Sequence, residues 1–200
     1  WASAMQQATV QMGKIAIQAL VNTMGVSVAA AFAVVNRIDD FAITPEQNIA
    51  HAMTALMAQN KGAGKNDRMR EGFRCGMILE IVYGAAVMVI CQVFAGELMA
   101  LFVKDEEVIG HGVIYLHLIA VMYILPAVTN AIQGFFRGIG KISVPVIGST
   151  LHISIRVVLS YLLIGRMGLE AVAFATGIGW ISVVLYQIVV YRKVRKQEFC

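Results

Sequence analysis

Six apolar stretches long enough to cross a membrane follow one another along the chain, and they restrict the fold more than any other feature. A spanning helix needs about 20 mostly apolar residues. The stretches that meet this requirement cover residues 4–25, 28–58, 73–96, 112–135, 144–165 and 169–191. Only 14% of the 200 residues are charged, whereas a soluble domain is nearer one quarter charged. The sequence therefore predicts an all-α integral membrane protein with six transmembrane helices.

Lysine and arginine gather on alternate connections between these stretches, which predicts the orientation of the helices. Those on one side are Lys61, Lys65, Arg68, Arg70, Arg74, Arg137, Lys141, Arg192, Lys193, Arg195 and Lys196. The opposite side has only Lys104 and Arg166. Because basic connections face the cytoplasm, we expect a multi-pass protein of the cell membrane with a cytoplasmic C-terminus. Basic residues clustered between apolar stretches also argue against a nucleic-acid partner.

The chain begins at Trp1, already inside an apolar helical pattern, and shows no basic n-region followed by a cleavage site. We therefore expect it to be the C-terminal lobe of a longer protein. A polar wall left facing lipid would be unfavourable. An absent N-terminal lobe, or a second copy of the chain, is expected to cover that wall.

Polar side chains of the first helix share one face. The stripe consists of Gln7, Gln11, Lys14, Gln18, Asn22 and Gly25. Spacings of three and four residues place all of them on one side of a helix. Such a stripe is either a seam of hydrogen bonds to a neighbouring helix or the wall of a water-filled path. A lysine near the middle of the bilayer favours the water-filled path, because a charge there is costly.

The stretch 28–58 carries three carboxylates at bilayer depth: Asp39, Asp40 and Glu46. Arg37 is close enough in sequence to pair with Asp39 or Asp40. Glu46 has no cation at helical spacing, so its partner is either Lys14 or a transported cation. Burial and nearby charges act on a carboxylate in opposite directions, and that balance lets it take up and release a proton. We expect at least one of the three to couple transport to Na⁺ or H⁺.

Further polar residues are candidates for a substrate path: Asn36, Arg37, Gln47, Asn130 and Arg156. Arg156 is either the counter-ion of a carboxylate or a substrate contact. Pro45 predicts tilt or a kink in the second helix, because proline removes a backbone donor. Glu80 is the one charge inside the third stretch, and its apolar surroundings favour a packing or lipid-facing position. The nearly apolar sixth stretch is expected to be scaffold.

Two segments, 62–65 and 138–141, end in Gly-x-Gly-Lys but lack the spacing and the following Ser or Thr of a phosphate loop. We interpret both as turns with basic anchors. The histidines are scattered, and neither a catalytic motif nor a metal-binding spacing is present. No catalytic residue, metal or cofactor is expected, and the protein is not predicted to be an enzyme.

Several segments resemble the multidrug and toxic compound extrusion (MATE) family. They are VNRID at 35–39 followed by Pro45, AQNKGAGK at 58–65, and GFFRGIGK at 134–141 with Pro145 after it. The resemblance covers essentially the whole chain, and the loop at 59–65 is its most specific part.

The resemblance implies a twelve-helix antiporter with two six-helix lobes around a central cavity. It would export cationic or amphipathic small molecules in exchange for Na⁺ or H⁺ by alternating access, and residues 1–200 would be helices seven to twelve. Where some members have a coupling acid on helix seven or ten, this chain has Lys14 and Asn130 or Gln133. Coupling would then rest on Asp39, Asp40 and Glu46, or on the absent lobe.

Two alternatives stay open at this point. A lipid-linked saccharide flippase of the same superfamily would need a cationic cavity, to which Lys14, Arg37 and Arg156 contribute. A non-transporting membrane scaffold would bury its polar stripes between tightly packed helices and leave no cavity.

Overall fold

The computed structural model describes residues 2–198, with side chains for residues 6–194. Over these residues the regular structure is entirely helical, which confirms the all-α prediction. The helices are α1 Ala2–Asn22, α2 Val26–Gly62, α3 Asn66–Val93, α4 Ala95–Ala100, α5 Glu106–Ala120, α6 Ile124–Gly138, α7 Ser143–Met167 and α8 Glu170–Glu198. Two residues of the predicted basic tail, Arg195 and Lys196, lie outside the described side chains.

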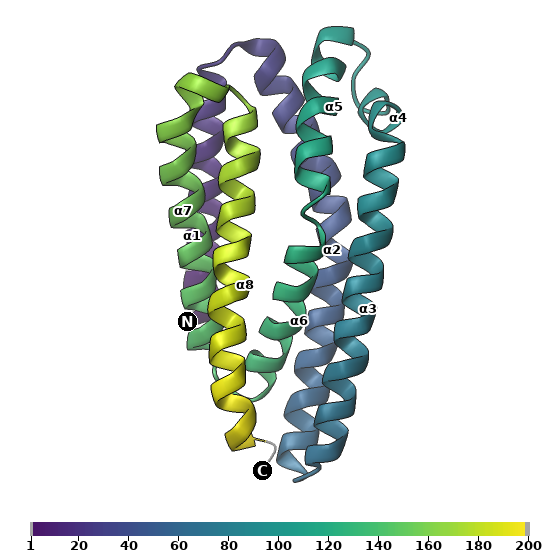
Figure 1. Ribbon diagram of the computed structural model, residues 1–200, viewed down its shortest axis with the longest axis vertical. Helices are drawn as coiled ribbons and strands as arrows, with labels where there is room; N and C mark the ends of the chain where they lie inside the picture. The colour runs from purple at the N-terminus through teal and green to yellow at the C-terminus, as the bar shows by residue number, and fades with distance from the viewer. Residues whose placement is uncertain (1, 199–200) are drawn as a thin grey trace.

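Each predicted stretch corresponds to a long helix or to a pair of helices (Figure 1). The largest difference is in 112–135, where the helix ends at Ala120, resumes at Ile124 and bends by 51°. By length and composition α3, α7 and α8 can each cross a membrane, and the bent pair α5–α6 makes a fourth candidate. Over the described residues, helices α1 and α2 are not among these candidates. The count of six spans therefore stays a prediction.

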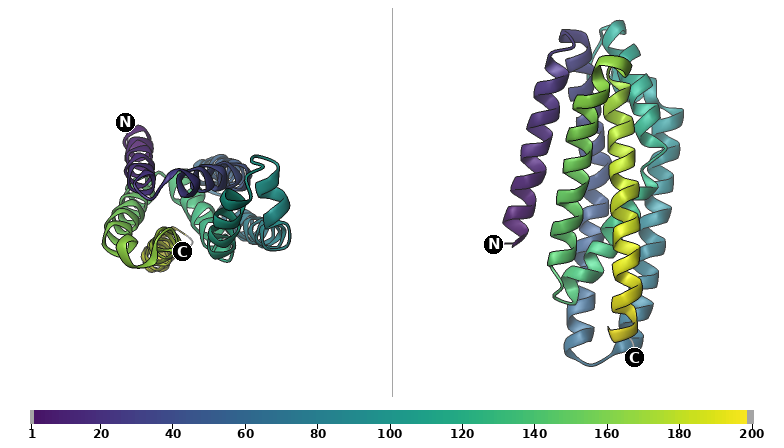
Figure 2. Two further views of the ribbon diagram at one scale, coloured as in Figure 1. Left: turned by 90° about the horizontal axis from the view of Figure 1, so that it is seen from above. Right: turned by 60° about the vertical axis from the view of Figure 1, so that its left-hand side comes forward.

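The connections predicted to be basic share one end of the bundle. In Figure 1 the α2–α3 and α6–α7 connections and the last turns of α8 lie at the lower end, and the α1–α2 and α7–α8 connections lie at the upper end. Helix α7 packs on α1 and α8, whereas α2 packs on α3, α5 and α6. Figure 2 shows the first group beside the second along the length of the molecule.

Two apolar cores occupy the two ends of the bundle, with polar residues between them. The upper core includes Phe32 and Tyr115, whose rings meet edge to face at 5.6 Å. The lower core includes Phe135 and Phe136, in a similar arrangement at 5.5 Å. Buried polar side chains lie at intermediate positions along α2, α3 and α6: Glu46, Glu80, Thr129 and Gln133.

Helices α2 and α6 approach each other closely because α6 has glycines where the two backbones meet. A Cβ atom added at Gly134 would lie 2.7 Å from the carbonyl oxygen of Ala50, and one added at Gly138 would lie 2.7 Å from that of Thr54. The Thr54 hydroxyl also donates to the Gly134 carbonyl at 3.3 Å. Small residues at a helix contact are typical of membrane bundles. Helix α2 continues through Pro45.

The two Gly-x-Gly-Lys segments end their helices with the same turn, as predicted. After α2, the backbone N–H of Lys65 donates to Asn60 and that of Gly64 to Lys61; after α6, Lys141 and Gly140 donate in the same register. Gly64 and Gly140 have φ of 66° and 85°, a conformation that favours glycine. The Lys61 ammonium donates to the Ile139 carbonyl at 3.1 Å, so the end of α2 is bonded to the end of α6.

Candidate functional site

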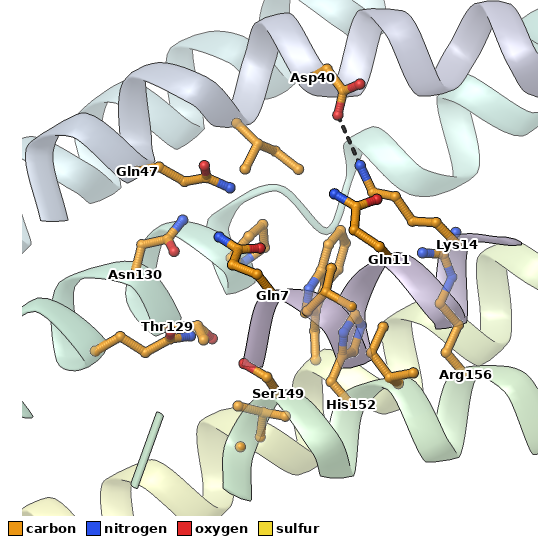
Figure 3. Close-up of a pocket in the computed structure, with 18 of the residues that line it drawn as sticks. Gln7, Gln11, Lys14, Asp40, Gln47, Thr129, Asn130, Ser149, His152 and Arg156 are labelled. Carbon is orange, nitrogen blue, oxygen red and sulfur yellow. Dashed lines mark hydrogen bonds and ion pairs between the residues drawn. The ribbon is translucent and has the colours of Figure 1, made fainter. Parts of the chain in front are cut away.

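A cavity of about 430 Å³ lies between α1, α2, α6, α7 and α8. Its polar and charged lining consists of Gln7, Gln11, Lys14, Asp40, Thr44, Gln47, Thr129, Asn130, Gln133, Ser149, His152 and Arg156. Figure 3 shows the α1 side chains between α2 on one side and α7 on the other. These elements are far apart in sequence, so the cavity is a product of the tertiary fold.

Six of the ten residues predicted for a substrate path line this cavity: Gln7, Gln11, Lys14, Gln47, Asn130 and Arg156. Of the three predicted coupling carboxylates, Asp40 lines it, whereas Asp39 and Glu46 do not.

The other four path candidates lie outside the cavity lining: Gln18, Asn22, Asn36 and Arg37. Gln18 donates to Asn22 at 2.8 Å along α1 itself. On the adjacent side of that part of α1, Ile17 and Val21 are fully buried in the upper core. The polar stripe is therefore continuous in sequence, but only its first half faces the cavity.

Two charged residues of the cavity lining, Lys14 and Asp40, form an ion pair between helices. The Lys14 ammonium of α1 donates to the Asp40 carboxylate of α2 at 3.0 Å, with side chains 47% and 66% exposed. Of the two alternatives considered for the partner of Glu46, Lys14 is therefore excluded. Arg37 is exposed and forms no ion pair with Asp39 or Asp40 among the described side chains. Helical spacing predicts only which residues share a face of one helix. The ion-pair partner of Asp40 is Lys14, which lies on a different helix.

Asp39 is not part of the cavity lining and accepts a hydrogen bond from the Tyr123 hydroxyl. Tyr123 lies in the break between α5 and α6, and only 1% of it is exposed. Arg156 of α7 is near enough to act electrostatically on Asp39. That arrangement supports the counter-ion interpretation of Arg156.

One wall of the cavity is aromatic, which the sequence did not indicate. The His152 and Trp180 rings stack with centroids 5.6 Å apart and planes 3° apart. Both residues line the cavity, although α8, which carries Trp180, was expected to be scaffold. A tryptophan in an otherwise apolar helix is the only signal that could have identified this contribution.

Amide groups close the cavity towards the basic end. The Gln6 amide donates to the Ser149 hydroxyl at 2.6 Å and to the Gln133 carbonyl at 3.3 Å. The Arg137 guanidinium donates to Gln133 at 3.0 Å and to Gln6 at 3.4 Å. This cluster joins α1, α6 and α7, and two of its members, Gln133 and Ser149, also line the cavity. Gln6, Gln133 and Ser149 were not assigned to the predicted site.

Two carboxylates lie behind the cavity wall formed by Asn130. Glu46 is 1% exposed, and its Oε2 accepts a hydrogen bond from the Asn130 amide at 3.2 Å. Glu80 of α3 is 0% exposed, which agrees with the packing alternative and excludes the lipid-facing one. No group of three or more His, Cys, Asp or Glu side chains able to hold a metal is present among the described residues.

Comparison with known proteins identifies the relatives of this fold. The sequence model of the MatE family matches residues 2–162. The chain is 27% identical over 146 residues to the probable multidrug resistance protein YoeA of Bacillus subtilis, covering 72% of this chain and 31% of that protein. It is 24% identical over 110 residues to the probable multidrug resistance protein NorM of Thermotoga maritima, covering 55% and 24% respectively. The chain thus spans about a third or less of these relatives.

Solved structures show the same fold. A MOP superfamily transporter from Pyrococcus furiosus superposes with a TM-score of 0.89 at 15% identity, covering 98% of this chain and 43% of that one. An inward-facing MATE family transporter superposes with a TM-score of 0.83 at 16% identity, covering 94% and 44%. The family match extends over most of the sequence and the helical arrangement agrees with it. The chain belongs to the MatE family of transporters.

Proposed function

We propose that this chain is one lobe of a secondary active antiporter that exports cationic or amphipathic small molecules in exchange for Na⁺ or H⁺. The observation that carries this proposal is a polar cavity bordered by ionisable groups from α1, α2 and α7. A scaffold protein would have its polar stripes sealed between helices. The similar proteins YoeA and NorM are described as probable multidrug resistance proteins, which supports the same class of activity.

The mechanism follows from charge and access. A ligand shifts the equilibrium between inward- and outward-open states only by its differential affinity for them. Cation or proton binding at Asp39, Asp40 or Glu46 would bias one state, and substrate in the cavity would bias the other. The absent lobe would complete the cavity. The basic end of the bundle supports a cell-membrane protein with a cytoplasmic C-terminus.

The test uses the full-length protein in a bacterial strain sensitive to cationic drugs. The variants Asp39→Asn, Asp40→Asn and Glu46→Gln are compared with wild type for drug resistance and for the amount of protein in the membrane. We expect resistance to be lost in at least one variant that still inserts normally. Undiminished resistance in all three would refute coupling through this lobe.

A second candidate is export of a lipid-linked saccharide, because the formal charges of the lining favour an anion. Lys14 and Arg156 line the cavity, and Asp40 is the one acid in the described lining. Purified protein is challenged with ethidium and with a lipid-linked saccharide, each in competition with a bound fluorescent dye. Displacement by the saccharide alone would favour this alternative.

A further inference from the structure

Glu80 is a buried carboxylate with no partner. It lies on α3 with 0% exposure, and neither side-chain oxygen has a hydrogen-bond partner among the described residues. An isolated ionised carboxylate is very costly in an apolar site, and such a group neutralises by taking up a proton instead. The mechanism above assigns Glu80 no task.

Glu46 faces the same small space from α2. Its Oε1 lies 3.5 Å from the position that a Cβ atom on Gly84 would take, and Gly84 follows Glu80 by one helical turn. The two carboxylates are near enough to interact electrostatically. Two carboxylates in one buried site cannot both ionise without a cation, because like charges in a low dielectric repel strongly.

The surroundings of the pair offer no positive charge among the described residues. Helices α2, α5 and α6 pack on α3. From α3 the phenol of Tyr83 is the additional titratable group that acts on the pair. From α6 the neutral amide of Asn130 contacts Glu46. Near Gly84 lie the Ala127 methyl of α6 and the Tyr123 backbone carbonyl of the break before it. A proton is therefore the simplest neutralising group.

Glu46 and Glu80 differ in their access to the cavity. Asn130 lines the cavity and donates to Glu46, and a hydrogen bond to a carboxylate favours its ionised form. Glu80 has no such donor. We propose that Glu46 and Glu80 form a proton-binding pair in which Glu80 holds a resident proton and Glu46 exchanges one with the cavity past Asn130.

This inference rests on the proposed antiport, for which it names the exchanging group. When Glu46 is protonated the pair is neutral; when the proton leaves for cavity water the pair carries one negative charge, and Asn130 donates to it. A cation bound beside Asn130 stabilises the ionised state. Substrate binding and proton release are thereby coupled, without direct contact between substrate and carboxylate.

The first experiment needs no substrate. Infrared difference spectra of the purified full-length protein are recorded as the pH is raised, for wild type, Glu46→Gln, Glu80→Gln and the exposed control Glu71→Gln. We expect the carboxylic-acid band that disappears with pH to be absent in Glu46→Gln alone. Glu80→Gln should lose a band that does not titrate, because glutamine resembles the neutral acid. Elution as a single folded species is checked for every variant.

Three results would overturn the proposal: titrating bands unchanged in Glu46→Gln, loss of the titrating band in Glu80→Gln, or removal of the carboxylic-acid bands when NaCl replaces choline chloride at fixed pH. The last result would indicate that the pair binds Na⁺ with both acids ionised.

A second measurement separates this proposal from the proposed function. Ethidium is added to weakly buffered full-length protein, its binding is followed by its own fluorescence, and proton release by a pH indicator. Wild type and Glu80→Gln should release about one proton per bound dye, and Glu46→Gln at least several-fold less. Failure of wild type to bind ethidium would count against cationic export, while the infrared spectra still decide the proton pair. Equal release from wild type and Glu46→Gln would reject the pair and leave export standing.

Discussion

Helix α2 has two polar faces, one of which lines the cavity while the other is buried against neighbouring helices. Asp40 and Gln47 face the cavity, where Asp40 is largely exposed and paired with Lys14. Glu46 and Ala50 are buried against α3 and α6, where glycines permit close contact and Glu80 has no hydrogen-bond partner among the described residues. The cavity face can change its charges at small structural cost, because water reaches them. The packed face cannot change its charges at small structural cost, so a change in the charge of a carboxylate there affects the packing of the bundle.

The largest effect is expected on the packed face, from Gly134→Leu. The Cβ atom alone would lie 2.7 Å from the Ala50 carbonyl oxygen, and backbone cannot move aside as a flexible side chain can. Overpacking a tight contact typically costs about 1–3 kcal/mol, and displacing a backbone lies at or above the upper end. We expect little folded protein by fluorescence-detected gel filtration of the full-length protein. The matched control is Gly110→Leu, where nothing lies within 4 Å of the added Cβ. Equal yields would show that α2 and α6 are loosely packed.

The second largest effect is expected on the cavity face, when the charges of Lys14 and Asp40 are changed. Lys14→Asp places two carboxylates opposite each other, and we expect about fivefold slower ethidium transport in everted vesicles, which corresponds to roughly 1 kcal/mol for a half-exposed pair. The double variant Lys14→Asp with Asp40→Lys restores an attractive pair and should recover most of the rate. If the double variant is no faster than the single one, the charges act separately and not as a pair.

A smaller effect is expected at the aromatic wall, from Trp180→Phe. The substitution keeps an apolar ring but reduces the surface stacked on His152. Aromatic pairs contribute about 0.5–1.5 kcal/mol beyond simple burial, so ethidium affinity should fall about two- to threefold. Fluorescence anisotropy of the dye measures it. Affinity equal to that of wild type would place the substrate away from α8.

The smallest effect is expected from Asp40→Asn on stability. An exposed ion pair contributes little, so the midpoint of thermal unfolding should stay within about 2 °C of wild type. Thermal gel-filtration scans of the full-length protein measure it. A fall as large as that caused by Gly134→Leu would mean that the Lys14 pair holds α1 against α2, and the contrast between the faces would disappear.

Periodicity and hydropathy predicted the helical elements well, because each depends on local sequence. The turns after Gly62 and Gly138 were recognisable for the same reason, since a left-handed glycine before lysine is a local signal. The break between α5 and α6 was not predicted. Pro126 stands at the third position of α6, but the break depends equally on how α3 packs against Tyr123.

The sequence predicted the site only where its residues share one face of a single helix. The stripe on α1 identified Gln7, Gln11 and Lys14, but the partner of Lys14 comes from another helix, 26 residues away. Glu80 was recognisable as the one charge inside its stretch, but its proximity to Glu46, 34 positions earlier, was not predictable from the sequence. Such pairings depend on the rotation of each helix about its axis, which hydropathy patterns leave free.

Gly84 has a consequence for the family as a whole. An added Cβ there would meet the Ala127 methyl at 2.9 Å and the Tyr123 carbonyl oxygen at 3.1 Å. Any larger residue would force α3 off the interrupted helix and let lipid reach carbonyls that have lost their helical donors. Homologues that keep the interruption should therefore keep glycine at this place, and those that fill it should have one unbroken helix in place of α5 and α6.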